Sequence, residues 1–220
     1  MITIHISEDI RQKCPPIRLG CLQMQVQVQP SSKELLAIIQ QTTEHLANQY
    51  KIEEISQRKH IQSTRNAYKS LGKKPGRYRP SAEALLRRVV THRGLYQINN
   101  VVDTLNYISI QSGYSIGGYD VDQISGSPEL TIGIRNEPYQ AIARGQLNIG
   151  NLPVLRDQLS AFGSPTSDSV RTSITEKTNH FLMVFFDFDH SEDLDNWLDQ
   201  SAKVFKKHTH AEQVEIWISK

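Results

Sequence analysis

The chain has 220 residues, of which 38% are hydrophobic and 22% are charged, an ordinary composition for a globular protein that can bury a core. No apolar run approaches the roughly 20 residues that a membrane-spanning helix needs, and the N-terminal residues lack the continuous apolar stretch of a signal peptide. We therefore expect a soluble, cytoplasmic protein. The two cysteines, Cys14 and Cys21, are too few for a disulfide framework and fit a reducing compartment.

Two strands and a helix are predicted at the start of the chain. Apolar and polar residues alternate around Ile2–Ile6 and again around Leu22–Val28, which is the pattern of half-buried strands. Ser31 and Glu34 have the spacing of a capping box, and the apolar residues after them predict a helix that continues to about Asn48.

The next part of the chain carries most of the positive charge. The formal net charge is only +2, but residues 58–93 contain 11 Lys or Arg and one acid, Glu83, so this segment is +10 and the remainder is −8 (14 minus 22). We predict a polar helix over Glu53–Ser70 and then a loop with the breaker-rich sequence GKKPGRYRP. Ser81 is predicted to cap the helix that follows, whose arginines face outward.

A local excess of cations implies an anionic partner. Basic side chains interleaved with tyrosines suit neutralisation of a phosphate backbone together with stacking on bases, so RNA is the natural candidate and DNA is not expected. The alternative is a solvated basic face that pairs partly with the acidic remainder of the fold. The predicted RNA-binding residues are Arg65, Lys69, Lys73, Lys74, Arg77, Tyr78, Arg79, Arg87 and Arg88.

A capped helix and a glycine-rich stretch come next. Asn99 is predicted to cap the helix, whose inward apolar stripe leaves Asn106 near its boundary, where the amide faces a cavity or is simply a polar boundary residue. The sequence GYSIGGYD, Gly113–Asp120, predicts a turn. Gly117 and Gly118 carry no Cβ, so a ligand can approach the backbone closely there.

The C-terminal half adds strands and one more helix. Alternation predicts a strand at Leu130–Ile134, and the continuous apolar run Phe181–Phe188 predicts a strand buried on both faces. Ser191–His208 is predicted to be a helix, with acids early and cations late, and Val214–Ile218 a final strand. Without βαβ regularity or an internal repeat, the predicted class is α+β, with a mixed, largely antiparallel sheet, flanking helices and a single domain over residues 1–220.

A polar stretch at Ala161–Thr175 gathers hydroxyls with Asp168 and Arg171 around a Gly-Ser-Pro turn. Hydroxyls and one carboxylate can position a water molecule or hold a ribose, whereas a Ser-His-Asp relay would need a His that the local sequence does not supply. The alternative is an Asx or Ser/Thr turn network that caps the strand.

The chain has no Walker sequence, no GxGxxG and no regularly spaced metal cluster. The acids of Asp187–Asp193 lie where a strand gives way to a helix, and acids are favourable there without a metal. We therefore expect neither a cofactor nor a metal.

A helix cap, an amphipathic helix, a glycine-rich turn and the start of a strand follow one another in Ile98–Gly126, INNVVDTLNYISIQSGYSIGGYDVDQISG. The positions that carry this pattern are Val101, Val102, Asp103, Asn106, Tyr107, Tyr119 and Asp120. In order and spacing it resembles the tRNA-editing module of the phenylalanyl-tRNA synthetase beta subunit, its third and fourth B-type domains. The resemblance covers about residues 65–186. It implies a free-standing module without an adenylation domain, which cannot aminoacylate tRNA by itself.

The resemblance also implies an activity. The family's module hydrolyses tyrosine wrongly esterified to phenylalanine tRNA, so the expected function is trans-editing hydrolysis of a mischarged aminoacyl-tRNA, with tRNA or aminoacyl-tRNA as partner. The pocket is expected between the Gly113–Asp120 and Ala161–Thr175 stretches. The alternative is a non-catalytic RNA or amino-acid-derivative binding module.

Two departures from the family pattern concern the site. The family's editing His corresponds to Gly117, and the Glu that senses the tyrosine hydroxyl has no counterpart in Phe162–Asp168, where Asp168 is the carboxylate that could substitute. Backbone N–H groups of the two glycines, with a loop hydroxyl, could stabilise the oxyanion. The predicted catalytic residues are Thr166, Asp168, Gly117 and Gly118. The predicted substrate-binding residues are Asn106, Tyr119, Asp120, Ser164 and Arg171.

Overall fold

The computed structural model describes residues 2–220, which contain two four-stranded sheets and a short hairpin. The first sheet is antiparallel throughout and has the strand order β10-β2-β9-β3. Its strands are β10 (Glu212–Ser219), β2 (Arg18–Gln25), β9 (His180–Asp187) and β3 (Ile116–Asp120). Strand β3 is an edge strand, so one side of its backbone faces away from the sheet.

The second sheet has the order β1-β4-β7-β8, in which β1 and β4 are parallel and the other pairs are antiparallel. Its strands are β1 (His5–Ile6), β4 (Glu129–Ile132), β7 (Pro153–Arg156) and β8 (Ala161–Gly163). The hairpin consists of β5 (Gln140–Ala141) and β6 (Gly145–Gln146). The predicted α+β class with largely antiparallel strand pairing is confirmed, although the strands form two main sheets where the sequence analysis predicted one.

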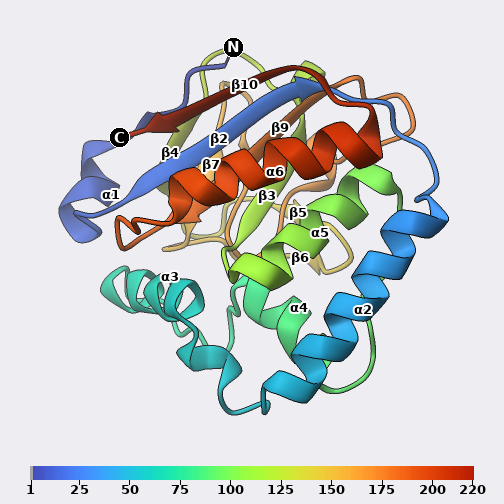
Figure 1. Cartoon of the computed structure of the whole chain (residues 1–220). Coiled ribbons are helices and arrows are strands. Elements are labelled where there is room, and N and C mark those ends of the chain that lie inside the picture. The colour runs from blue at the N-terminus through green and yellow to red at the C-terminus, as the bar shows by residue number, and fades with distance from the viewer. Residues whose placement is uncertain (1) are drawn as a thin grey trace.

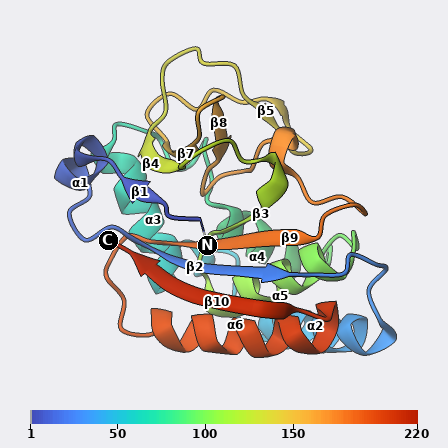
Figure 2. The ribbon, with the colours of Figure 1, turned by 90° about the horizontal axis from the view of Figure 1, so that it is seen from above.

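Helices cover one face of the first sheet, and the second sheet covers the other. Figure 1 shows α6 and α5 in front of the first sheet, and Figure 2 shows β4, β7 and β8 on the opposite side of it. The α-helices are α1 (Glu8–Lys13), α2 (Lys33–Gln49), α3 (Lys59–Ser70), α4 (Ser81–Val90), α5 (Asn100–Ser112) and α6 (Leu194–Thr209). Three short 3-10 helices are η1 (Ile55–Gln57), η2 (Val121–Gln123) and η3 (Val170–Thr172). Across residues 2–220, no helix combines the length and apolar character needed to cross a membrane.

Strand β9 runs through the core, and its side chains alternate between the two faces of the sheet. Phe181 and Phe185 pack with residues of α5 and α6, whereas Leu182 and Val184 pack with residues of the second sheet. All four are fully buried. Each such side chain contributes roughly 1.5–3 kcal/mol by leaving water. The prediction of a strand buried on both faces is therefore confirmed.

Helix α2 begins one residue later than the capping-box pattern predicts. The cap is Ser32, whose Oγ accepts a hydrogen bond from the Leu35 N–H at 3.1 Å. Ser31 instead donates its hydroxyl to Asp103 Oδ2 at 2.6 Å, so it ties the start of α2 to α5. The Ser31 cap was wrong because a long-range carboxylate takes the hydroxyl that the local pattern assigned to the helix.

Other predicted boundaries also change. The helix predicted over Glu53–Ser70 is divided into η1 and α3, because Arg58 between them has an extended ψ of 136°. Ser81 is the first residue of α4 rather than its cap, and its N–H donates to the Pro165 carbonyl at 2.7 Å. Strand β4 ends at Ile132, earlier than predicted.

The stretch predicted as a glycine-rich turn is mostly strand β3. The turn is confined to Gly113, which has a φ of 81° and ends α5 in the left-handed conformation. Gly117 and Gly118 lie in the ladder opposite Val184 and Met183 of β9. The turn prediction was wrong because glycine permits a turn but also permits close packing against a strand.

These two glycines make room for neighbouring side chains. A Cβ on Gly117 would lie 2.8 Å from Tyr119 Cε2 and would overlap the Tyr119 hydroxyl, because the tyrosine ring folds back over the glycine. A Cβ on Gly118 would lie 2.6 Å from Leu105 Cδ1 on the other face. Both distances are shorter than real carbon contacts, so any other residue forces a shift of the core.

We predict that Gly117→Ala destabilises the protein by about 1–3 kcal/mol, because the added methyl group displaces the buried Tyr119 ring. Chemical denaturation followed by circular dichroism measures the change. The matched control is Gly76→Ala, since a Cβ there meets no atom within 4 Å, and it should be neutral or stabilising by up to about 1 kcal/mol. Equal stability of Gly117→Ala and the wild type would contradict this packing.

Candidate functional site

The two stretches that the sequence analysis placed around a pocket meet in the structure. Strand β3 contributes its outward backbone, and the loop after β8 contributes Asp168. The Tyr119 hydroxyl donates to Asp168 Oδ1 at 2.8 Å, and the Gly118 N–H donates to Asp168 Oδ2 at 3.3 Å. The Ser164 N–H, from the loop itself, donates to Oδ1 at 3.3 Å. A single carboxylate thus joins the edge of the first sheet to a loop of the second.

The space between these stretches is filled by Tyr119. Its side chain is fully buried and makes an edge-to-face contact with Phe162, with the ring centroids 5.0 Å apart. Gly163 lies across the ring from Gly117, and a Cβ on Gly163 would lie 2.6 Å from Tyr119 Cζ. The predicted substrate-binding Tyr119 therefore lies between two glycines, with its hydroxyl on the predicted catalytic carboxylate.

Asp168 has unusual electrostatics for an aspartate. Burial raises its pKa to about 7, although the hydrogen bonds from Tyr119, Gly118 and Ser164 favour the ionised form and oppose this shift. Burial, and next the nearby Asp168 charge, raise the pKa of the Tyr119 phenol well above its usual value, so the phenol stays protonated and remains a donor. A carboxylate that titrates near neutral pH is suited to accept a proton from water.

The loop hydroxyls are engaged in local bonds. The Ser164 hydroxyl donates to the Ser167 carbonyl at 2.9 Å and accepts from the N–H groups of Thr166 and Ser167. The buried Thr166 hydroxyl shares a 2.8 Å hydrogen bond with the Tyr68 hydroxyl from α3. This is the Ser/Thr turn network that the sequence analysis kept as an alternative, and in this arrangement it also positions Asp168.

Three predicted substrate-binding residues lie outside the immediate contacts of Asp168. Arg171 donates to Asp157 Oδ1 at 2.9 Å and to the Gln123 carbonyl at 2.8 Å. Asp120 is buried and accepts from the Thr178 hydroxyl at 2.8 Å. Asn106 lies in the middle of α5 and is partly exposed. Their roles toward a substrate remain predictions.

Part of the basic segment is used inside the fold. Arg58 donates to the Ile110 and Gln111 carbonyls at 2.8 and 2.6 Å, so it binds the last carbonyls of α5. Lys73 is buried, and its ammonium group donates to the Asn148 carbonyl at 3.0 Å and to the Gly150 carbonyl. The same ammonium nitrogen lies 3.9 Å from the centroid of the Tyr78 ring. Lys73 and Tyr78 thus form a structural pair in the loop before α4.

One buried acid organises three more cations. Glu83 is fully buried, and its carboxylate lies 2.8 Å from Arg65, 2.9 Å from Arg87 and 3.6 Å from Arg79. The sequence analysis kept as an alternative a basic face that pairs partly with the acidic remainder of the fold. For these three arginines the partner is instead Glu83, the one acid of the segment itself. Lys69, Lys74, Arg77 and Arg93 remain exposed.

A second polar cluster had not been predicted. The His60 ring stacks on Tyr114 with centroids 3.7 Å apart, and both side chains bind the Asp193 carboxylate, at 3.1 and 3.0 Å. Arg18 forms a buried ion pair with Asp187 at 2.6 Å. The Asp187–Asp193 acids were visible in the sequence, but their partners come from distant elements. Among residues 2–220, no group of three or more His, Cys, Asp or Glu side chains has a metal-binding arrangement.

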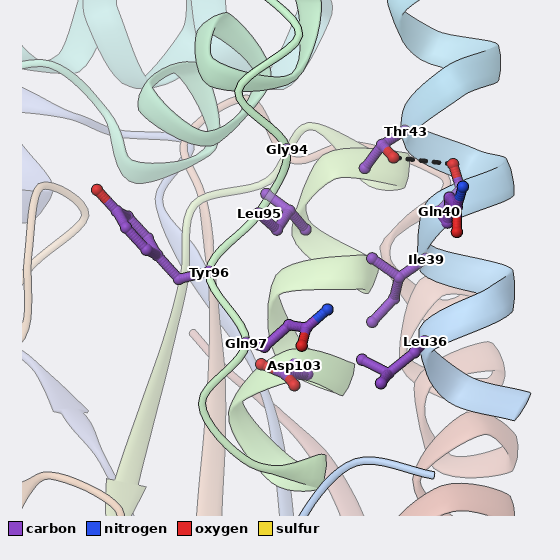
Figure 3. A pocket seen from close by; sticks show the side chains of 9 residues that line it. All are labelled: Leu36, Ile39, Gln40, Thr43, Gly94, Leu95, Tyr96, Gln97 and Asp103. Carbon is purple, nitrogen blue, oxygen red and sulfur yellow. Dashed lines mark hydrogen bonds between the residues drawn. The ribbon is translucent and has the colours of Figure 1, made fainter. Parts of the chain in front are cut away.

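A groove lies between α2 and residues 94–97. Figure 3 shows Leu36 and Ile39 of α2 facing this segment, whereas the Tyr96 ring points away from the groove. The groove has a volume of about 240 Å³ and is lined mainly by apolar and amide side chains. Asp103 at its base accepts from the Ile98 N–H at 2.9 Å, and burial raises the pKa of its carboxyl. Asp103 therefore holds this region together by accepting hydrogen bonds from the Ser31 hydroxyl and the Ile98 N–H.

Comparison with known protein families supports the resemblance. The B3/4 domain family matches residues 63–218, from α3 into β10. The chain therefore belongs to the B3/4 domain family, the family of the phenylalanyl-tRNA synthetase beta-subunit editing module. A search of curated proteins gave no match.

Among solved structures, the chain is similar to an N-terminal fragment of the phenylalanyl-tRNA synthetase beta subunit from Pyrococcus horikoshii. The sequence identity is 10% and the TM-score is 0.49. The comparison covers 100% of this chain and 54% of the fragment, so the chain spans about half of that fragment's length.

We predict that the Asp168 carboxyl titrates near pH 7 in a carbon-13 NMR titration of the folded protein, because burial disfavours its charge. Asp157 provides an internal comparison: burial raises its pKa, but backbone N–H groups and Arg171 outweigh this and lower it below its usual value. Since the folded-state pKa of Asp168 exceeds the unfolded value of about 4, this group makes the protein less stable as the pH rises from about 4 to about 7. A midpoint near 4 would show that the carboxylate is well solvated.

Proposed function

We propose that this protein binds aminoacyl-tRNA and hydrolyses the ester bond of a mischarged one, with Asp168 as the general base. The observation that carries the proposal is the carboxyl group whose pKa burial raises to about 7, where β3 meets the loop after β8. Membership of the B3/4 domain family supports the substrate class. Such a function belongs in the cytoplasm, where aminoacyl-tRNAs are used.

The chemistry requires one water molecule and one ester. Asp168 accepts a proton from the water molecule while the oxygen of that water attacks the ester carbonyl carbon, and a tetrahedral intermediate forms. Collapse of the intermediate breaks the bond to the terminal ribose oxygen, which takes the proton back from Asp168. The products are the free amino acid and uncharged tRNA. The Gly118 and Ser164 N–H groups orient the carboxylate in the resting protein.

The remaining proposed roles require rearrangement on substrate binding. The predicted oxyanion donors are the Gly117 and Gly118 N–H groups and the loop hydroxyls, and Gly118, Ser164 and Thr166 already have partners. Tyr119 is fully buried next to Asp168, and in this proposal its ring moves to admit the aminoacyl group. The ring therefore acts as a gate in this proposal.

A second candidate function is a non-catalytic module that binds RNA or an amino-acid derivative. The specific observation in its favour is the same buried Tyr119, whose hydroxyl already satisfies Asp168 in the absence of a substrate. The hydrogen bond between the Thr166 and Tyr68 hydroxyls also favours the non-catalytic module, because the predicted catalytic hydroxyl already has a partner. The two candidates differ in whether ester hydrolysis occurs above the spontaneous rate.

We predict that the purified protein hydrolyses one member of a panel of mischarged aminoacyl-tRNAs, including tyrosine on phenylalanine tRNA, and that Asp168→Asn reduces the rate by about 10²–10⁴-fold because the general base is lost. The matched control is Asp122→Asn, a change at an exposed side chain bonded to His180. It should retain the wild-type rate, and both variants should bind tRNA equally. Hydrolysis by none of the panel, with tRNA still bound, would leave the binding module as the function.

We predict that Tyr119→Phe shifts the pH dependence of kcat/KM. The Tyr119 hydroxyl lowers the pKa of Asp168 through its hydrogen bond, so its removal raises that pKa and moves the rise in activity to higher pH. Tyr139→Phe is the control, because its hydroxyl donates to the Ser167 carbonyl of the same loop rather than to the carboxylate. An unchanged midpoint in Tyr119→Phe would remove Asp168 from the role of base.

A further inference from the structure

A hollow on the surface beside α4 is lined by arginines from separate parts of the chain. It has a volume of about 620 Å³. Its arginines are Arg79, Arg87, Arg88, Arg93 and Arg144, and its other lining residues are Ile52, Ala84, Thr91 and Tyr96. Arg144 lies in the β5–β6 turn, more than 50 residues from Arg93, so the fold creates this concentration of charge. The lining residues described by the structure include no acid.

The charge of these arginines is only partly neutralised. Glu83 lies beneath the surface and pairs with Arg79 and Arg87, whose side chains remain 43% and 27% exposed. The Nε atoms of Arg79 and Arg88 are buried without a hydrogen-bond partner. One carboxylate against five guanidinium groups leaves a large excess of positive charge in a concave site, and such a site attracts phosphate groups.

An aromatic side chain completes the hollow. Tyr96 is 62% exposed, and the Arg88 guanidinium lies 3.9 Å from its ring centroid while also donating to its hydroxyl at 3.1 Å. A large, exposed aromatic ring held by a cation offers a surface on which a base can stack. Phosphate-binding cations beside a stacking ring are the features that single-stranded nucleic acid requires.

The walls of the hollow are connected to the Asp168 loop. The N–H of Ser81, at the start of α4, donates to the Pro165 carbonyl at 2.7 Å, and the Ile142 N–H, two residues before Arg144, donates to the Asp168 carbonyl at 2.9 Å. Both connections are direct backbone hydrogen bonds to the segment that carries the proposed base. A strand of RNA in the hollow would therefore lie against the two elements that support this loop.

We infer that this hollow binds the phosphodiester backbone of single-stranded RNA, with a base stacked on Tyr96. The inference rests on the proposed function in that the bound strand is the acceptor end whose ester reaches Asp168. It also narrows the RNA-binding surface: Arg93, Tyr96 and Arg144 belong to it, whereas Lys73 and Arg65 support the fold. The exposed Lys69 and Lys74 lie outside the lining of the hollow.

The test is the binding of a short, fluorescently labelled single-stranded RNA by charge-reversal variants at several salt concentrations. We expect the double variant Arg93→Glu with Arg144→Glu to weaken binding at least tenfold and to reduce the salt slope by about 1.4, or about 0.7 for each lost phosphate contact. Both side chains lie outside the Glu83 cluster, so folding should be retained, and circular dichroism checks this.

The matched control is Lys69→Glu with Lys74→Glu, which makes the same change in net charge within the basic segment. This control variant should weaken binding of the RNA much less. Equal losses in the two double variants would overturn the inference, because binding would then depend on overall charge. Tyr96→Ala should weaken binding of the RNA but not of inorganic polyphosphate, and equal binding of the RNA by Tyr96→Ala and wild type would remove the stacking site.

Failure of the inference can be separated from failure of the proposed function. If the wild type shows no hydrolysis but the double variant Arg93→Glu with Arg144→Glu binds the RNA more weakly than the wild type, the hollow is an RNA site and the proposed enzyme activity is wrong. If the wild type hydrolyses a mischarged tRNA and the same variant does so with unchanged KM, the activity stands and the hollow is not the RNA site.

Discussion

The packing of Tyr119 is the constraint on which the relation between the two sheets depends. Its ring starts on β3 of the first sheet and lies against Phe162 and Gly163 of the second, and its hydroxyl binds Asp168. Two glycines leave the volume that the ring occupies. Since protein interiors tolerate little overlap, the sheets keep this separation only while both positions lack a Cβ. Burial raises the pKa of Asp168 in this region, and the hydrogen bond from the Tyr119 hydroxyl partly opposes the rise.

Electrostatics on the basic surface depend on a buried acid in a comparable way. A carboxylate without solvent is costly unless it is paired, and Glu83 is paired with arginines from α3, from the loop before α4 and from α4 itself. This pairing fixes three elements relative to one another. Other cations of the segment have different surroundings: Lys73 binds backbone carbonyls inside the fold, whereas Arg93 is exposed and lines the arginine hollow.

The sequence predicted what depends on local pattern and missed what depends on distant partners. The apolar run of β9 identified the central strand, and the family pattern identified the B3/4 domain. The glycine-rich stretch was assigned to a turn because its close neighbour, the Tyr119 ring, acts through packing that spacing does not reveal. Likewise, Ser31 was assigned to the wrong partner, since Asp103 lies 72 positions further along the chain. The placement of Arg144 in the same hollow as the α4 arginines had no sequence signal.

The identity of Gly117 and the position of Tyr119 are one coupled feature. The family resemblance places the editing His at the position of Gly117, but any side chain there would collide with the Tyr119 ring as this chain packs it. A histidine and this tyrosine conformation therefore exclude each other. The group that the tyrosine hydroxyl contacts is Asp168, whose pKa is raised to about 7 by burial. The absence of a Cβ at Gly117 and the contact between Tyr119 and Asp168 are thus parts of one arrangement, because the ring needs the space at the glycine and its hydroxyl holds the carboxylate.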